Sequence, residues 1–174
     1  RDVVDPGPWC DTRDLAIKRD LEKAYDLLNW DYIKCVLENF GFYQEWINLV
    51  MECITSTSFS FNISGESHGY FNASRGIRQG DPLSPYIFIL CMEPLIRSLN
   101  ELAITLKFHI DLLTSPFGYR VSNLIFADDC LNFAKATTKG VRKVLEVLNK
   151  FAYASGQQIN FNKSSLYFSS NTSN

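Results

Sequence analysis

The sequence has few of the residues that build a metal-stabilised or disulfide-linked domain. Its five cysteines form no Cys-x-x-Cys pair, and only two histidines are present, His68 and His109, which argues against a structural zinc site. The cysteine count is odd, and several cysteines lie inside apolar patterns. This usage is typical of buried thiols in a reducing compartment.

Long apolar runs and an excess of basic residues are also missing. No stretch is apolar enough to span a bilayer and no signal peptide is visible, so we expect an intracellular protein, nuclear or cytoplasmic, without a membrane partner. Seventeen lysines and arginines stand against 19 acidic residues, a net charge of −2. The chain thus has no overall basic footprint for nucleic acid, although a catalytic piece can leave its basic surfaces to neighbouring segments.

The residues that are present suit a single globular domain. With 174 residues, 46% of them hydrophobic, the chain can bury a core. Thirteen phenylalanines and eight tyrosines favour a domain that contains a sheet. We expect an irregular segment over residues 1–14, one domain over 15–168 and a disordered polar tail over 169–174.

Hydrophobic periodicity predicts alternating strands and helices. The expected order is a short strand over 15–19, helices over 30–40 and 44–54, a half-exposed strand over 58–63 turning back through 69–71, a buried helix over 86–103, a buried strand over 121–126 followed by another over 131–134, a helix over 139–154, and extended pieces at 159 and 166–168. This order predicts an α+β fold, a mainly antiparallel sheet with helices packed on one face.

Two adjacent carboxylates, Asp128 and Asp129, follow the apolar strand that ends in Phe126-Ala127. Too few residues separate the two strands for more than a tight hairpin turn, so both acids lie at its tip. Burying two like charges without partners costs several kcal/mol, and a divalent cation such as Mg²⁺ removes that cost. The alternative is an exposed Asp-Asp turn that only ends the hairpin.

Two other segments carry candidate chemistry. The first strand ends at Asp20, and if it neighbours the Asp-Asp hairpin, three carboxylates would hold two Mg²⁺ ions roughly 3.5–4 Å apart, as in-line phosphoryl transfer requires. Without that pairing, Asp20 is a strand-end acid or a helix N-cap. In the loop over residues 75–85, Gly76 and Gly80 allow close backbone approach to a ligand and Gln79 offers both donor and acceptor. The alternative is a polar strand-to-helix connection.

Together these segments resemble the reverse transcriptases of non-LTR (LINE-type) retrotransposons, most closely those of plants. The matching words are Asp20-Leu-Glu-Lys-Ala-Tyr-Asp26 with Asn29-Trp30, Arg75-Gly-Ile-Arg-Gln-Gly-Asp-Pro-Leu-Ser-Pro85, Phe126-Ala-Asp-Asp129, and Ala154-Ser-Gly-Gln-Gln-Ile-Asn160 with Lys163-Ser164. The resemblance covers roughly residues 14–170. It implies a polymerase palm that acts as an RNA-directed DNA polymerase.

The resemblance also implies roles for individual residues. Asp20 and Asp128 correspond to the main ligands of two Mg²⁺ ions, which Mn²⁺ could replace, and Asp129 to a further ligand. Tyr25 resembles the side chain that lies beneath the incoming sugar and rejects a 2′-hydroxyl. The implied partners are an RNA template, a DNA primer and dNTPs. Gln79 and Gly80 then contact the incoming nucleotide, and Lys163 is a candidate proton donor to pyrophosphate.

The chain departs from the family pattern in several places. Arg19 stands where the family usually has an apolar strand residue, and an unpaired charge there costs on the order of a few kcal/mol. Cys130 stands where serine is common. Compared with the family pattern, we also expect the fingers, the thumb and the endonuclease domain to be missing from these residues. A catalytically inactive remnant, or a weak nucleic-acid-binding module, is therefore the alternative function, and the palm of an intron maturase or another polymerase is a third.

Overall fold

A computed structural model describes residues 14–106, 110–111, 120–121, 123–126 and 129–168. Its central element is a five-stranded antiparallel sheet. Strand β1 (Asp14–Glu22) lies in the middle, between β7 (Asp129–Lys135) on one side and β8 (Gln158–Ile159) with β9 (Ser165–Phe168) on the other, and β6 (Asn123–Phe126) pairs with β7 at the edge. The first strand and the strand that begins at Asp129 are neighbours, which is the condition under which Asp20 can meet the Asp-Asp hairpin.

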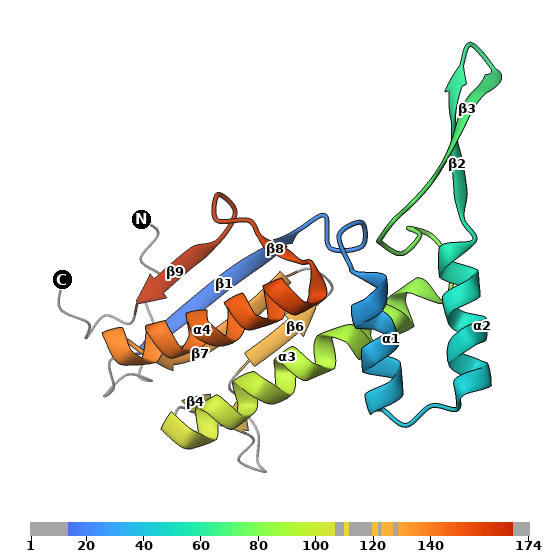
Figure 1. Cartoon of the computed structure of the whole chain (residues 1–174). Coiled ribbons are helices and arrows are strands. Elements are labelled where there is room, and N and C mark those ends of the chain that lie inside the picture. Colours follow the sequence, from blue (N-terminus) through green and yellow to red (C-terminus); the bar gives the residue numbers. More distant parts are fainter. Residues whose placement is uncertain (1–13, 107–109, 112–119, 122, 127–128, 169–174) are drawn as a thin grey trace.

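Four helices accompany this sheet in the described part of the chain, and they lie to one side of it. Helix α4 (Thr138–Ser155) and the long α3 (Ser84–Leu106) lie on the same face of the sheet, and α1 (Trp30–Asn39) and α2 (Gln44–Thr55) pack beside α3 (Figure 1). The other face of the sheet carries no helix in this view. The predicted α+β architecture, with helices on one face of a mainly antiparallel sheet, is confirmed.

The alternation of β1 decides which of its residues enter the core. Leu15, Ile17 and Leu21 are 1%, 6% and 3% exposed and belong to one hydrophobic cluster with the buried sides of the four helices. Successive side chains of a strand point to opposite faces. Lys18 and Asp20 therefore lie on the face away from the helices, which we call the open face.

Local sequence signals set the helix ends. The side chain of Asn29 accepts a hydrogen bond from the backbone nitrogen of Asp31 and caps α1, and Thr137 caps α4 in the same way through Gly140. Gly156, with φ of 77°, ends α4. No helix in the described ranges is long and apolar enough to cross a membrane.

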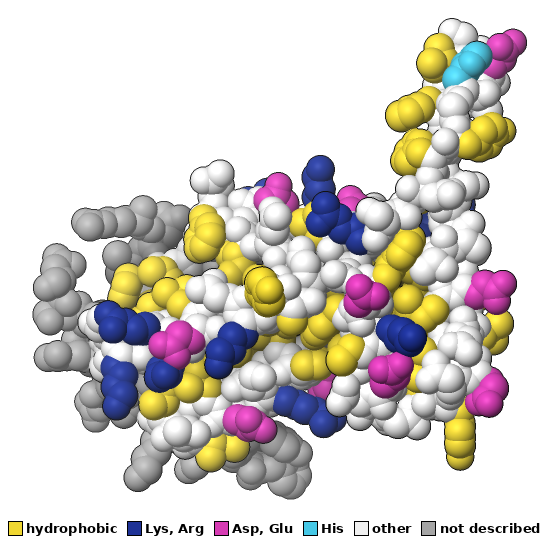
Figure 2. Space-filling view, viewed as in Figure 1, with side chains coloured by type: hydrophobic (Ala, Val, Ile, Leu, Met, Phe, Trp, Pro, Cys, Tyr) yellow, Lys and Arg dark blue, Asp and Glu magenta, His cyan; other side chains and the backbone are white. Residues whose placement is uncertain are grey.

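A hairpin of β2 (Ser58–Ile63) and β3 (Glu66–Asn72) projects from the body of the molecule, with hydrophobic side chains along its length (Figures 1 and 2). Every residue of both strands is exposed, so the expectation of a half-exposed strand underestimated its exposure. The strands are held to each other by their ladder and by stacking of Phe59 on Phe71, with ring centroids 5.6 Å apart.

The expectation of one buried strand over residues 121–126 is wrong. Val121 pairs with Ile110 in a separate two-stranded sheet, β4 (Ile110–Asp111) with β5 (Arg120–Val121). Leu124 in β6 is 51% exposed, because β6 is an edge strand and Leu124 pairs with Leu131 on the open face. Residues 1–13, residues 127–128, where a tight turn was expected, and the expected tail over 169–174 lie outside the described residues.

Candidate active site

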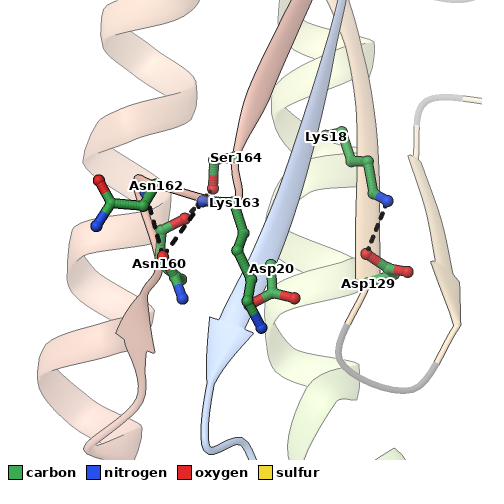
Figure 3. A network of polar contacts seen from close by, with 7 residues as sticks. All are labelled: Lys18, Asp20, Asp129, Asn160, Asn162, Lys163 and Ser164. Carbon is green, nitrogen blue, oxygen red and sulfur yellow. Dashed lines mark hydrogen bonds and ion pairs between the residues drawn. The ribbon is translucent and has the colours of Figure 1, made fainter.

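Two of the predicted carboxylates lie opposite each other at the end of the ladder between two neighbouring strands. Asp20 in β1 and Asp129 in β7 are register partners. Partners in an antiparallel pair point to the same face with Cβ atoms about 4.5–5.5 Å apart. Both side chains therefore stand on the open face (Figure 3). Asp128, the other predicted ligand, lies outside the described residues.

Each of these carboxylates has a lysine near it. Nζ of Lys18 lies 3.3 Å from Oδ1 of Asp129, and Nζ of Lys163 lies 4.0 Å from Oδ1 of Asp20 (Figure 3). Asp20 is the more enclosed acid, with 17% of its side chain exposed against 50% for Asp129. The two ammonium groups offset the repulsion between the paired acids.

The segment that follows β1 is joined to the glycine-rich loop by backbone hydrogen bonds. The backbone nitrogen of Ile77 donates to the carbonyl of Tyr25 at 2.8 Å, and that of Gly76 to the carbonyl of Leu28 at 2.7 Å. Nε2 of Gln79 donates to Oδ1 of Asp26 at 3.2 Å. The predicted nucleotide contact, Gln79, is thereby tied to the segment that follows β1.

Gly76 has a steric reason to be glycine. Its φ is +89°, and a Cβ there would lie 2.6 Å from the carbonyl oxygen of Asp26. Gly80 also has a positive φ, +85°, but a Cβ would meet nothing within 4 Å. Gly76 therefore allows two backbones to meet, whereas Gly80 only allows the turn.

The segment after α4 also forms hydrogen bonds with the segment that follows β1. The backbone nitrogen of Asn29 donates to the carbonyl of Ser155, and Nε2 of the buried Gln157 donates to the carbonyl of Ala24. The backbone nitrogen of Asn160 donates to the carbonyl of Asp20 at 3.0 Å. The glycine-rich loop and the segment after α4, although distant along the chain, therefore both form hydrogen bonds with residues 20–30.

A cavity of about 830 Å³ opens between these three segments. It is lined by residues 20–25, residues 79–82, Pro85, Asn160 and Lys163. The cavity thus brings together five of the seven predicted site residues, Asp20, Tyr25, Gln79, Gly80 and Lys163. Asp129 lies beside it as the register partner of Asp20.

Tyr25 is fixed at the wall of this cavity. Its ring stacks on that of Phe88 from α3, with centroids 5.0 Å apart and an interplanar angle of 11°. Phe88 is only 3% exposed and is itself anchored in the core. A stacked aromatic pair of this kind contributes about 0.5–1.5 kcal/mol beyond its buried area, so the tyrosine has a defined orientation.

Lys163 is presented by a polar turn. Oδ1 of Asn160 accepts from the backbone nitrogens of Asn162 and Lys163, and the carbonyl of Asn160 accepts from the hydroxyl of Ser164 (Figure 3). Asn160 thus links Asp20 to the lysine that approaches it. Sequence reasoning assigned no role to Asn160 or Lys18. The spacing Asn-x-Asn-Lys is a signal for such a side-chain-capped turn.

Arg19 lies beneath the site, on the helix face of the sheet. It is 3% exposed and donates to Oδ1 of Asn132 and to Sγ of its register partner Cys130. Burial lowers the pKa of Arg19, and the neighbouring Cys130 partly opposes that effect. The predicted unfavourable charge in the core is therefore present, and it is satisfied by neutral acceptors.

In the described part of the chain, no group of three or more His, Cys, Asp or Glu side chains is placed to hold a metal ion. The donor set of Asp20 and Asp129 consists of carboxylate oxygens, which hard divalent cations prefer. These two residues, on one face of adjacent strands, fit such an ion chemically.

An antiparallel sheet backed by helices, with acids on its open face beside a cavity, defines a polymerase palm. The chain belongs to the reverse transcriptase (RNA-dependent DNA polymerase) family, whose profile matches residues 11–173.

Its relatives confirm the resemblance to non-LTR retrotransposon proteins. The chain is 32% identical over 149 residues to a retrovirus-related Pol polyprotein from the type-2 retrotransposable element R2DM of Drosophila melanogaster, covering 83% of this chain and 13% of that protein. It is 27% identical to a 149 kDa protein of the transposon TX1 of Xenopus laevis, covering 84% and 11%. It is 44% identical over 69 residues to an uncharacterized mitochondrial protein of Arabidopsis thaliana, covering 40% and 56%.

Solved structures agree on the fold. Apo telomerase from Candida tropicalis, truncated from its C-terminal domain, superposes with a TM-score of 0.69 at 16% identity, over 94% of this chain and 32% of that chain. Telomerase from the same organism, in complex with a fragment of telomeric RNA, superposes with a TM-score of 0.71 at 13% identity, over 97% and 28%. The chain spans between a tenth and a third of the polymerase-type proteins it matches.

Proposed function

We propose that this chain is the palm of an RNA-directed DNA polymerase that adds deoxynucleotides to the 3′-hydroxyl of a primer paired with an RNA template. The observation that carries the proposal is the register pairing of Asp20 with Asp129 beside a cavity that also contains Tyr25, Gln79 and Lys163. The family match supports this activity, and the RNA-bound telomerase neighbour supports an RNA partner.

Mg²⁺, with Mn²⁺ as a substitute, is the metal that we propose for this site. Asp20 and Asp129 would hold it, together with Asp128, the residue that precedes Asp129 in the sequence. Divalent ions in such sites lower the pKa of the attacking hydroxyl and neutralise charge on the leaving group. The chain's own contribution is to hold Asp20 and Asp129 on strands of a rigid sheet rather than on a loop.

The remaining residues bind and orient the nucleotide in this proposal. Tyr25, held by Phe88, presents a flat ring where a 2′-hydroxyl would collide, so the site favours deoxyribose. Gln79 and Gly80 form the opposite wall and contact the incoming nucleotide. Lys163 extends from its turn toward Asp20, from where Nζ can give a proton to the departing pyrophosphate.

The proposal is tested by single-nucleotide primer extension on an RNA template with Mg²⁺ or Mn²⁺. This readout is chosen because it requires only one chemical step and does not depend on processive synthesis. Asp20→Asn and Asp128→Asn should each abolish addition. Asp31→Asn, on the exposed start of α1, is the matched control and should retain it.

Two results would overturn the catalytic proposal. One is extension that survives in Asp20→Asn. The other is a chain that adds no nucleotide and shows no Mn²⁺ binding by electron paramagnetic resonance, which would establish the alternative of an inactive remnant. Loss of Mn²⁺ binding in Asp20→Asn, with binding retained in Asp31→Asn, supports the proposed ligand even where synthesis is slow.

A further inference from the structure

Helix α4 concentrates positive charge on one side of the molecule. It carries Lys139, Arg142, Lys143 and Lys150 against the single acid Glu146, a net charge of +3. Because the whole chain carries −2, all residues outside α4 together carry −5. Figure 2 shows this helix face, with dark blue side chains gathered over α4 around one magenta side chain.

The other described helices do not share this pattern. Helix α1 contains two acids and one lysine, α2 contains two acids and no basic residue, and α3 contains two acids and one arginine. An exposed helix face that serves only solubility usually mixes both signs. The separation of charge therefore calls for a reason specific to α4.

The spacing places these charges in one stripe. Lys139, Arg142, Glu146, Lys150 and Tyr153 follow one another at intervals of three or four residues, which puts them on the same face of a helix. The stripe covers about 21 Å at 1.5 Å per residue. The opposite face of α4 packs into the core through its buried residues Val144, Leu148 and Phe151.

Helix stability does not explain the stripe. The positive end of a helix dipole lies at its N-terminus, where cations are unfavourable by about 0.3–1 kcal/mol each. Lys139, Arg142 and Lys143 nevertheless lie in the first two turns of α4, whose first turn has no acid and whose last turn has no base. The arrangement opposes the dipole and adds to the positive potential at that end.

The cations are largely free to meet a partner. Nζ of Lys143 lies 2.7 Å from Oε2 of Glu146, whereas Lys139, Arg142 and Lys150 form no ion pair with any described residue. The hydrogen bond from Lys143 and the charges of Lys143, Lys150 and Arg142 lower the pKa of Glu146. Glu146, the only acid in the stripe, is thus stabilised in its charged form by these three basic side chains.

We propose that this basic stripe of α4 binds the phosphate backbone of single-stranded nucleic acid. Tyr153, 93% exposed and one turn beyond Lys150, is the stacking platform for a base at the end of the stripe. Cations that follow a backbone next to an exposed aromatic ring are the combination that sequence-tolerant single-strand binding uses. An acidic protein partner would also match the positive charge of the stripe, but it would not explain the exposed tyrosine at its end.

This surface is separate from the proposed catalytic site. The acids Asp20 and Asp129 stand on the open face of the sheet, and α4 covers the other face. One strand in the catalytic cavity therefore does not occupy the stripe. The inference does not depend on catalysis, and it can hold even in a chain that adds no nucleotide.

The first test compares two double variants of equal net charge by fluorescence anisotropy with a labelled 20-nucleotide oligouridylate. Lys139→Gln/Arg142→Gln removes two cations of the stripe, and the control Lys34→Gln/Arg97→Gln removes two from α1 and α3. Each phosphate contact to a single strand contributes about 0.7 to the slope of log affinity against log salt. The stripe variant should therefore have a slope smaller in magnitude by about 1.4. If its affinity equals that of the unmodified chain at 1 M salt, it should be about 25-fold weaker at 0.1 M salt.

Equal weakening by both double variants, or no weakening by the stripe variant, would overturn the proposal. Circular dichroism checks the folding of each variant, and removal of cations from the start of α4 should leave its melting temperature unchanged or slightly raised. The same titration with oligothymidylate shows whether RNA and DNA bind alike. Displacement of the RNA by polyglutamate at equal charge concentration would instead assign the stripe to an acidic protein and reject a nucleic-acid role.

A second test locates the bound strand directly. Tyr153→Ala should weaken oligouridylate binding by roughly fivefold or more, the effect expected for loss of one base–aromatic stack. Tyr43→Ala, which removes another exposed tyrosine, should not. Oligonucleotides with 4-thiouridine should crosslink to peptides within residues 138–155. Crosslinks confined to the open face, on β1 or β7, would contradict the stripe.

Discussion

The guanidinium group of Arg19 donates two hydrogen bonds to one buried acceptor, Oδ1 of Asn132, at 2.7 and 3.1 Å. The two residues are 113 positions apart and lie on neighbouring strands, on the face opposite Asp20 and Asp129. Nδ2 of Asn132 has no partner among the described residues, so the amide is held through Oδ1, which accepts from Arg19 and, at 3.5 Å, from Sγ of Cys130. The family pattern places an apolar residue at position 19, and here a polar cluster replaces that contact.

This pair predicts an asymmetric mutational response. Asn132→Ala leaves a buried charge without its main acceptor and should lower the free energy of unfolding by about 1.5–3 kcal/mol. Arg19→Leu/Asn132→Leu removes both polar groups and should be neutral or stabilising. Urea denaturation of both variants, and of the single variants Arg19→Leu and Asn132→Leu, measures the coupling energy. A double variant less stable than Asn132→Ala would contradict the physical picture.

A second prediction concerns Lys18, whose ammonium lies 3.3 Å from the carboxylate of Asp129. A metal ion at that carboxylate must compete with the lysine. Lys18→Met should therefore raise the affinity of the chain for Mn²⁺ a few-fold, a modest change because both side chains are about half exposed. Electron paramagnetic resonance of free Mn²⁺ gives the measurement. Lys34→Met on α1 is the control, and weaker binding in Lys18→Met would show that the lysine supports the ion instead.

A third prediction separates two glycines of the same loop. Gly80→Ala places alanine at positive φ in open space and should lower the free energy of unfolding by about 1–2 kcal/mol. Gly76→Ala adds a clash, because its Cβ would lie 2.6 Å from the backbone oxygen of Asp26. It should be clearly more destabilising than Gly80→Ala in thermal or urea unfolding. Equal effects would mean that the loop shifts freely and does not hold Gln79 in place.

A fourth prediction concerns thiol reactivity, which depends on the thiolate form. Burial raises the pKa of Cys91 to about 12 and also raises that of Cys130, where Arg19 partly opposes the effect. Cys35 and Cys53 are exposed. At pH 8, iodoacetamide should modify Cys35 and Cys53 rapidly and Cys91 and Cys130 only after unfolding, as mass spectrometry of peptides would show. Rapid modification of Cys130 in the folded chain would contradict the packing beneath the site.

Local order is the part of the fold that the sequence predicts well. Helices α1, α2 and α4 begin and end within two residues of their expected bounds, because their apolar stripes and caps are local signals. The strand over 121–126 was not predicted well, because an edge strand and a buried strand share the same apolar composition. Leu124 is exposed because β6 pairs with β7 on one side and, among the described residues, has no neighbouring strand of the sheet on the other.

The candidate site divides in the same way. The sequence by itself determined the acids Asp20 and Asp129 and the glycine-rich loop, since carboxylates at strand ends and glycines at turns are readable from composition and spacing. Only the tertiary structure decided that Asp20 pairs with Asp129, that Lys18 lies against that acid, and that the stripe of α4 faces away from both. These relationships join residues up to about a hundred positions apart, and strand register and sheet order, which no local periodicity encodes, determine them.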